Sequence, residues 1–411
     1  MQPMRRESPY PMVPVEEAQR IIAGQIAPLG DELIDSLGAE GRVLAEDVLA
    51  DAPLPDVPKA AVDGYALRAA DGLEPRQVLA EITAGAPHNA PLPPGAAARI
   101  MTGAPLPPGA DAVIMVEQTD EQAGVLRTRQ PVAPGDSIHP VGLDIAAGQL
   151  VLARGSVLGP AEVGLLATLG RVRVRAFRRP VVAVLATGDE VYEPSAELPP
   201  GGIRDSNRYA LLAAAREAGC ATLSLGIARD QAEAQRAAML AGLEQADVLL
   251  TSGGVSMGTR DLIKPLLAEL GTVHFGRIAF KPGKPTTFAT VRGKLAFGLP
   301  GFPVSSLVSF EVFVRPALRR LQGDAHPERP LVRVALADPI VAPGDRPEYQ
   351  RAVVSWRDGR LVASSTGGQG SSRLISLRGA NALLLVPGDG RAYQPDDELQ
   401  AMLTGPIHNG T

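Results

Sequence analysis

Short apolar runs alternate with amphipathic stretches between residues 180 and 321, and this alternation predicts an α/β domain. Apolar runs without polar interruption are typical of parallel strands that helices cover on both faces. Strands are expected at Val181–Ala186, Thr222–Ile227, Asp247–Leu250, Val273–Phe280, Thr286–Val291 and Lys294–Gly298. Helices are expected at Ser206–Ala218, Gln231–Gln245, Asp261–Leu270 and Val304–Leu321. This order of elements predicts a doubly wound domain over residues 180–323.

Proline and glycine break up the first 150 residues, which predicts short strands joined by turns. The segment LPPGA occurs at Leu92–Ala96 and again at Leu106–Ala110, each time before a strand-like run, and a duplicated hairpin would explain this spacing. We therefore interpret residues 47–148 as a β-rich inserted domain. Helical patterns at Val15–Ile26 and Pro160–Leu169 flank it. We expect these two helices to pack together, so that residues 8–46 and 149–179 form a helical hinge and dimerisation domain.

Strand patterns return after Gly323-Asp324, for example at Leu331–Ala337, Gln350–Trp356 and Leu361–Ser364. Asp358-Gly359 is a typical turn between the last two. Residues 324–411 fit a small β-barrel or sandwich, and we take a β-barrel as the expectation. The fold class is thus multidomain α/β and β.

Charge and composition exclude several classes of protein. The chain has 40 basic and 45 acidic residues, and a net charge of −5 has the wrong sign for a protein that coats nucleic acid. No run reaches the ~18 apolar residues of a membrane span, and the N-terminus lacks the apolar core of a signal peptide, so a cytoplasmic protein is expected. A single cysteine, Cys220, excludes an intrachain disulfide and reads as a small buried residue. Five scattered histidines do not indicate a tetrahedral zinc site.

Polar loops follow the predicted strands, at the edge of the sheet where open α/β domains bind ligands. The loop Thr187–Glu190 offers a hydroxyl and two carboxylates around a glycine, although a solvated turn explains this tetrapeptide equally well. The loop Thr251–Asp261 contains three glycines and several hydroxyls, so its backbone N–H groups can approach an oxyanion. A loop that only turns the chain is the alternative. No Walker A pattern occurs, which argues against an ordinary P-loop ATPase or GTPase.

Two lysines, Lys281 and Lys284, lie in a proline-stiffened loop that can hold an anion at low entropic cost. Arg277 precedes them on the same strand face. A second rigid turn, Gly298–Pro303, leads into a helix. Carboxylates such as Glu190 and Asp261 would repel a phosphate unless a hard cation bridges them, and Mg²⁺ prefers such oxygen ligands. The sequence therefore implies a divalent cation.

Asp63, Thr102 and Asp144 lie at glycine-supported turns of the β-rich region. Each is individually an ordinary turn residue. Nothing in the residues themselves places them at the α/β crevice.

Six motifs in this order resemble the molybdopterin molybdenumtransferase family, which includes the catalytic end of gephyrin. They are DGYA at residues 63–66, MTGAPLPPGADAV at 101–113, TGDE at 187–190, GGVSMG..D at 253–261, KPGKP at 281–285 and GLPG.PVS at 298–305. Each motif is weak alone, but the ordered set covers most of the chain.

The resemblance implies four domains, a homodimer and a defined reaction. Adenylylated molybdopterin, supplied by a molybdopterin adenylyltransferase, and molybdate would give molybdenum cofactor and AMP with the help of Mg²⁺. It implies catalytic roles for Asp63, Thr102, Asp144, Glu190, Asp230, Asp261 and Lys281, with Glu190 and Asp261 on the metal. It implies substrate contacts from Gly253, Gly254, Ser256, Arg277, Lys284, Pro300, Pro303, Arg351 and Ser371. Asp63, Thr102 and Asp144 would come from the second subunit.

Three positions depart from the family pattern. Val62 replaces the usual Met, Phe302 stands where Asn is frequent, and Arg277 stands where some members have Lys. The first two are expected to alter ligand fit, whereas Arg277 keeps the charge in a different geometry.

Two other functions compete with this interpretation. The α/β domain also resembles molybdopterin adenylyltransferases, but those resemble this domain alone, without the flanking β-rich parts. A non-enzymatic scaffold, as gephyrin partly is, would have no need of Asp63, Glu190, Asp261 and Lys281.

Overall fold

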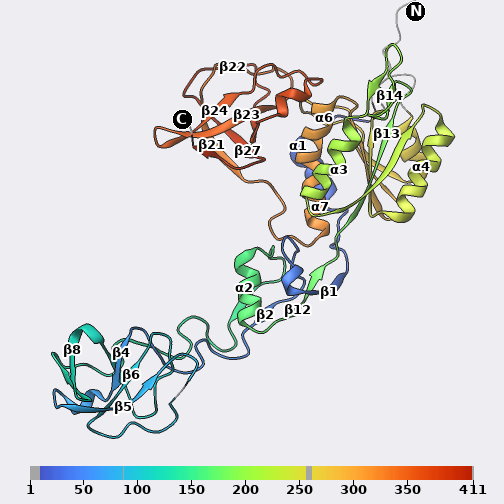
Figure 1. Cartoon of the computed structure of the whole chain (residues 1–411). Helices are drawn as coiled ribbons and strands as arrows, with labels where there is room; N and C mark the ends of the chain where they lie inside the picture. Colours follow the sequence, from blue (N-terminus) through green and yellow to red (C-terminus); the bar gives the residue numbers. More distant parts are fainter. Residues whose placement is uncertain (1–9, 87, 256–261, 410–411) are drawn as a thin grey trace, which may run out of the picture. The chain divides into compact units, whose positions relative to one another are not determined.

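The computed structural model describes residues 10–86, 88–255 and 262–409, which form two compact units (Figure 1). The first unit contains the chain up to Ala45, Gly155–Gly159 and the chain from Arg173 onward. The second contains Glu46–Arg154 and Pro160–Val172. Among the described residues, no helix combines the length and apolar character that crossing a membrane requires.

A six-stranded sheet forms the centre of the first unit, with the order β16-β13-β17-β20-β19-β18. Its strands are β13 (Val181–Thr187), β16 (Ala221–Ala228), β17 (Val248–Ser252), β18 (Thr272–Phe275), β19 (Thr287–Val291) and β20 (Lys294–Leu299). The first four in the order are parallel, and β19 and β18 add an antiparallel edge. The predicted doubly wound α/β domain is confirmed.

Helices cover both faces of this sheet, because successive residues of each strand point to opposite sides. Val182 and Val184 of β13 pack with α3 (Asn207–Glu217), α6 (Pro303–Ser309) and α7 (Arg315–Leu321). Ala183 and Leu185 pack with α4 (Ala232–Gln245) and α5 (Ile263–Leu270) on the other face. Figure 1 shows α3 and α4 on opposite sides of β13.

Two expected elements differ in detail. The helix expected at Val304–Leu321 forms, but Phe310–Val314 adopts a π-helical turn between α6 and α7. The strand expected at Val273–Phe280 ends at Phe275, because the chain then leaves the sheet and pairs with the N-terminal segment. Val13 and Ile278 form a parallel bridge there, and the Ala279 amide donates to the Val13 carbonyl at 2.8 Å.

The expected packing of the two flanking helices on each other is wrong. Helix α1 (Val15–Ala23) buries Val15, Ala18 and Ile22 in the core of the α/β domain, and the Gln19 side chain donates to the Val312 carbonyl. Helix α2 (Pro160–Thr168) belongs to the second unit. The chain segments that precede and follow the second unit in the sequence instead pair as antiparallel strands, β1 (Asp31–Asp35) with β12 (Arg173–Phe177).

The second unit contains a sheet with the order β7-β4-β6-β5-β9-β8. Its strands are β4 (Gly64–Leu67), β5 (Arg76–Ile82), β6 (Ala96–Ile100), β7 (Ala112–Met115), β8 (Thr119–Gln122) and β9 (Val125–Thr128). Strand β4 separates β6 from β7, so the two LPPGA segments do not form duplicated hairpins. They contact each other instead, since the Leu92 amide donates to the Pro108 carbonyl at 2.7 Å.

The expected C-terminal β-barrel is present. Strands β21 (Leu331–Leu336), β27 (Glu398–Leu403), β25 (Ala382–Val386), β23 (Glu348–Arg357) and β24 (Arg360–Ser365) pair in this order, and β24 closes the ring by pairing with β21. Asp358 and Gly359 have φ angles of 49° and 76° and form the expected turn between β23 and β24. Strand β28 (His408–Asn409) extends the sheet beside β23.

Short two-stranded pairs complete the architecture. They are β2 (Val48–Leu49) with β11 (Leu150–Leu152), β3 (Lys59–Ala60) with β10 (Ile138–His139), β14 (Val191–Tyr192) with β15 (Ile203–Arg204), and β22 (Ile340–Val341) with β26 (Ala392–Tyr393). Of these, β14 and β15 follow directly from the end of β13 and lie closest to the candidate site.

Cys220 is free and buried, as expected. Burial raises the pKa of its thiol to about 12, so the reactive thiolate is scarce at neutral pH. We expect iodoacetamide at pH 8 to leave the native protein unmodified and to alkylate it fully in denaturant, as read by intact-mass spectrometry. Rapid labelling of the native protein would contradict this burial.

Candidate functional site

A cavity of about 420 Å³ opens at the carboxyl ends of β13, β17 and β20. The three strands end level with one another, because Ala186 pairs with Ser252 and Ser252 pairs with Leu299. The chain passes from β13 to β16 on one side of β13 and then crosses from β16 to β17 on the other side, which makes this the topological switch point where open α/β sheets bind ligands. The lining includes Thr187, Gly188, Glu190, Ile203, Asn207, Asp230, Ser252, Gly253, Gly254, Pro285, Pro300, Phe302 and Pro303.

The turn after β17 needs glycine at its first position. Gly253 has a φ of 96°, and a Cβ there would lie 2.8 Å from the Thr187 carbonyl oxygen. The Thr187 hydroxyl also donates to the Ser252 carbonyl at 3.2 Å, which joins the ends of β13 and β17. Backbone therefore lines this wall of the cavity directly, as a ligand phosphate requires.

Carboxylates line another part of the cavity. The Glu190 carboxylate folds back over Gly188, where a Cβ would lie 2.8 Å from one of its oxygens. The Asp230 amide donates to the Asp189 carboxylate at 3.1 Å, and Arg229 donates to the Asp189 carbonyl at 2.6 Å. These bonds join the end of β13 to the end of β16 and bring Glu190 and Asp230 to one cavity.

Asn207 is a cavity residue that the sequence analysis missed. Its Nδ2 donates to the Ser252 hydroxyl at 2.8 Å and to the Gly301 carbonyl at 2.7 Å, so one side chain ties together the loops after β17 and β20. Its Oδ1 is buried without a partner among the described residues. The available signal was its place at the start of a helix that follows a strand of the sheet.

Buried charges fix the start of α3 behind Asn207. The Arg208 Nε donates to the Asp205 carboxylate at 2.6 Å. Its Nη2 donates to both carboxylate oxygens of Glu193, at 2.7 and 2.6 Å. Asp205 also accepts the Arg208 backbone amide at 3.0 Å. These paired charges hold the segment from β14 to α3 in one arrangement.

The donor set of the cavity fits a hard cation. Glu190 and Asp230 supply carboxylate oxygens beside the hydroxyls of Thr187 and Ser252. Mg²⁺ typically uses one or two carboxylates, retained waters and ligand phosphates. In the part of the chain that the structure describes, no group of three or more His, Cys, Asp and Glu side chains is assembled for a metal. Asp261 and Ser256, predicted here, lie outside the described residues.

The lysine loop reaches the cavity through Pro285 alone, and neither Lys281 nor Lys284 lines it. Pro285 lies in the lining, one residue after Lys284. The Lys281 ammonium lies 3.5 Å from Asp345, and its backbone exchanges hydrogen bonds with Pro347 and Tyr349 of the C-terminal domain. Arg277 is half-buried in the preceding segment, next to the Val13 bridge. This loop therefore joins the α/β domain to the barrel.

Arg351 of strand β23 is hydrogen-bonded to the loop of the barrel domain that contains Ser371. Arg351 is fully buried, and its guanidinium donates to the Ser376 hydroxyl at 3.1 Å and the Gly370 carbonyl at 3.4 Å. Its Nη1 has no partner among the described residues, and burial lowers the pKa of this side chain. The Ser371 carbonyl accepts the Val304 amide at 3.1 Å, which places the loop beside the Pro303 rim of the cavity.

Asp63 and Thr102 are in contact in the second unit. Neither their spacing in the sequence nor any periodicity predicted this contact. Asp63 accepts hydrogen bonds from the Thr102 amide at 2.6 Å and its hydroxyl at 2.7 Å. These two bonds hold the pKa of the Asp63 carboxyl below its usual value. Asp144 is exposed on another turn, where its amide donates to the Leu54 carbonyl at 2.9 Å.

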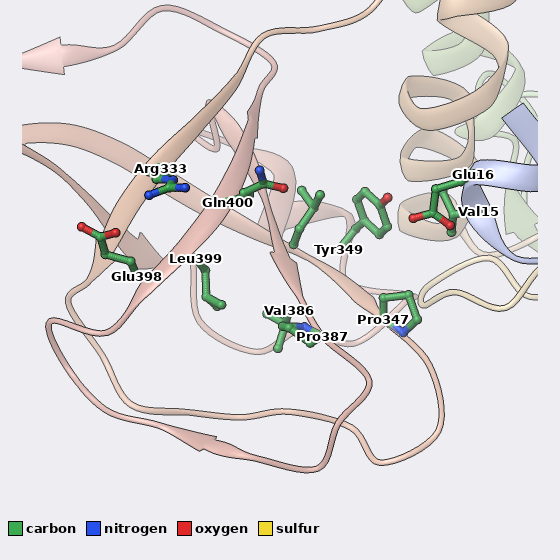
Figure 2. A pocket seen from close by; sticks show the side chains of 11 residues that line it. Val15, Glu16, Arg333, Pro347, Tyr349, Val386, Pro387, Glu398, Leu399 and Gln400 are labelled. Atoms are coloured by element: carbon green, nitrogen blue, oxygen red, sulfur yellow. The ribbon is translucent and has the colours of Figure 1, made fainter.

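A second cavity, of about 520 Å³, lies between the start of α1 and the C-terminal barrel (Figure 2). Its charged side chains are Glu16, Arg333 and Glu398, around a mostly apolar wall that includes Tyr349. Two carboxylates against one guanidinium disfavour a phosphate, and no predicted site residue lines it. The cavity at the strand ends is therefore the candidate active site.

Three family descriptions match successive parts of the chain. Residues 13–170 match the MoeA N-terminal region (domain I and II), residues 183–320 a probable molybdopterin binding domain, and residues 333–403 the MoeA C-terminal region (domain IV). Together they cover most of both units.

Named relatives agree with these matches. Gephyrin of Dictyostelium discoideum is 37% identical over 98% of this chain, which spans only 64% of that relative's length. Molybdopterin molybdenumtransferase 2 of Mycobacterium tuberculosis is 37% identical, with 91% of this chain and 95% of the relative covered. The molybdopterin molybdenumtransferase of Bacillus subtilis is 35% identical, with 95% and 94% covered. A crystal structure of a molybdopterin biosynthesis MoeA protein from Pyrococcus horikoshii superposes with a TM-score of 0.82 at 32% identity, covering 96% of this chain and 100% of the other.

Proposed function

This chain belongs to the molybdopterin molybdenumtransferase family, and from that premise we propose that its cavity binds adenylylated molybdopterin, which reacts with molybdate to give molybdenum cofactor and AMP. The chain is a transferase of molybdenum cofactor biosynthesis that inserts molybdenum into molybdopterin. The adenylylated form of the substrate, the role of Mg²⁺ and a cytoplasmic location are the specific parts of the proposal.

One observation carries it: carboxylates, hydroxyls and a glycine turn surround a single cavity at the switch point of the sheet. Cleaving a phosphoanhydride needs positioning and charge neutralisation more than a strong nucleophile. In the proposed complex, the backbone of the Gly253–Gly254 turn approaches the phosphates, with the Gly253 amide itself bonded to the Leu299 carbonyl at 3.1 Å. Asn207 keeps that turn and the Pro300–Pro303 turn at a fixed separation, because it bonds to both sides.

Glu190 and Asp230, together with Asp261 from outside the described residues, would hold Mg²⁺ at the phosphate end of the cavity. When bound there, the cation neutralises charge on the phosphates and on the leaving AMP. Lys284 and Lys281 contribute further positive charge from the adjoining loop, with Arg277 behind them. None of these side chains is proposed as a nucleophile.

Molybdate is a tetrahedral oxyanion, so guanidinium and hydroxyl groups are suitable partners. Arg351 provides a buried guanidinium whose Nη1 has no partner among the described residues. The loop that it contacts reaches the cavity rim, where the Val304 amide donates to the Ser371 carbonyl. We assign Arg351 and this loop to molybdate.

Asp63, Thr102 and Asp144 of the β-rich domain are proposed to complete the site from the second subunit of a homodimer. The short hydrogen bonds between Asp63 and Thr102 support this, because they orient a carboxylate on an exposed turn. The upstream partner is proposed to be a molybdopterin adenylyltransferase, which makes the adenylylated substrate.

The test is molybdate-dependent release of AMP from adenylylated molybdopterin by the purified full-length chain with Mg²⁺. We expect AMP and active cofactor in equal amounts, and no AMP when molybdate is omitted. ATP and molybdopterin without the adenylylated intermediate should give no product, which separates insertion from adenylyl transfer. Absence of molybdate-dependent AMP would refute the adenylylated substrate.

A further inference from the structure

Phe302 differs from every other phenylalanine of this chain in its exposure. The chain has eight phenylalanines, and seven of them are buried with at most 4% of their surface exposed. Phe302 is 59% exposed and lines the cavity at the strand ends. An uncovered aromatic ring at a polar cavity is a surface that a planar ligand can cover.

The backbone holds Phe302 firmly although its ring is exposed. Pro300 and Pro303 restrict the turn on both sides, and Phe302 is the residue that precedes helix α6. The Phe302 carbonyl accepts the Ser306 amide at 2.9 Å, and the preceding Gly301 carbonyl accepts Asn207 Nδ2 at 2.7 Å. A rigid backbone lowers the entropy lost when a ligand fixes the side chain.

A second apolar side chain is uncovered at the same cavity. Ile203 of β15 is 53% exposed and also contributes to the lining. The same lining includes Glu190, Asp230 and the glycine turn, together with apolar residues such as Val191. The cavity thus offers both charged groups and exposed apolar side chains to a ligand.

We propose that Phe302 stacks on the planar nitrogen heterocycle of the bound substrate and thereby sets the affinity of this cavity for it. This inference rests on the proposed function, whose substrate contains two such rings, a purine and a pterin. Stacking requires only a flat π-face and tolerates different ring edges, so it adds affinity without reading the pattern of ring nitrogens. The phosphates, held elsewhere in the cavity, do not depend on it.

The test compares ligands with and without a ring by isothermal titration calorimetry of the full-length protein. The probes are AMP, ribose 5-phosphate and 6-hydroxymethylpterin, and the variants are Phe302→Ala, Phe302→Tyr and Phe302→Asn. Trp356→Ala is the matched control, because Trp356 is also a largely exposed aromatic, at 48%, but lies on β23 outside this cavity. Thermal unfolding of each variant verifies that the fold is retained.

In Phe302→Ala and Phe302→Asn, we expect affinity for AMP or for the pterin to fall on the order of tenfold, with Phe302→Tyr close to the parent protein. The probe that weakens identifies the ring that is stacked. Ribose 5-phosphate should bind all variants equally, and Trp356→Ala should change nothing.

Two results would overturn the inference while leaving the proposed function intact. The first is equal binding of AMP and of the pterin to Phe302→Ala and to the parent protein. The second is an equal loss of ribose 5-phosphate binding, which would indicate a distorted turn. If the parent protein binds neither AMP nor the pterin, the proposed substrate cavity itself is wrong, and the inference falls with it.

Discussion

Glu190→Gln is expected to lower molybdate-dependent AMP release by roughly 10²–10³-fold, because it removes a negative charge from the carboxylate pair that is proposed to hold Mg²⁺. Glu190 is exposed, so the fold should tolerate an uncharged side chain of the same shape. The measurement is the initial rate of AMP formation, read by chromatography over a series of Mg²⁺ concentrations. A metal role predicts that high Mg²⁺ partly restores the rate.

Glu197→Gln is the matched control for this variant. It makes the same change at an exposed position of the segment between β14 and β15, outside the cavity lining. Asp230→Asn should reproduce the loss, since Asp230 lines the same cavity. Full activity in both Glu190→Gln and Asp230→Asn would contradict Mg²⁺ binding at this end of the site. A rate loss that added Mg²⁺ does not change would instead indicate a role in substrate orientation.

Arg351→Lys is expected to raise the KM for molybdate at least roughly tenfold while affinity for AMP stays unchanged. Lysine keeps the positive charge but lacks the planar fork that can bind two oxyanion oxygens at once. The measurement is the dependence of AMP release on molybdate concentration at saturating adenylylated substrate. Isothermal titration calorimetry measures the affinity for AMP.

A purely structural role for Arg351 gives a different outcome. Its guanidinium also braces the loop through Ser376 and Gly370, so the substitution is expected to cost stability, by about 1–3 kcal/mol for lost buried hydrogen bonds. Loss of stability with an unchanged KM for molybdate would show that Arg351 only stabilises this loop and does not bind molybdate. Ser376→Ala is the matched control, because it removes the same brace and leaves the arginine in place.

The alternation of apolar runs and helices was sufficient to predict the α/β domain, although the strand expected at Val273–Phe280 ends at Phe275. Val182 to Leu185 must satisfy two covered faces at once, and only an uninterrupted apolar run does so. The turn at Asp358-Gly359 was also predicted from local sequence, since both residues adopt positive φ values that few other residue pairs accept. Local chemistry thus revealed where strands end and which loops carry carboxylates and glycines.

Periodicity could not reveal which surfaces meet. Helix α1 has an apolar face, but that face shows only that it is buried and not whether its partner is α2 or α7. The two LPPGA segments look like one unit repeated, yet they lie next to each other while β4 separates the strands that follow. Partner choice depends on shape complementarity between distant segments, which no local pattern records.

The sequence by itself determined the kind of chemistry at the strand ends: carboxylates, a glycine turn and stiffened lysines in loops that follow predicted strands. Only the tertiary structure decided that Asn207 joins two of these loops, that Lys281 is tied to the barrel, and that Phe302 is exposed over the cavity. The physical reason is that residue type fixes what a side chain can bind, whereas its position depends on hydrogen bonds and packing across long sequence separations. Phe302 shows this most clearly, because its seven counterparts have the same chemistry and are buried in the core.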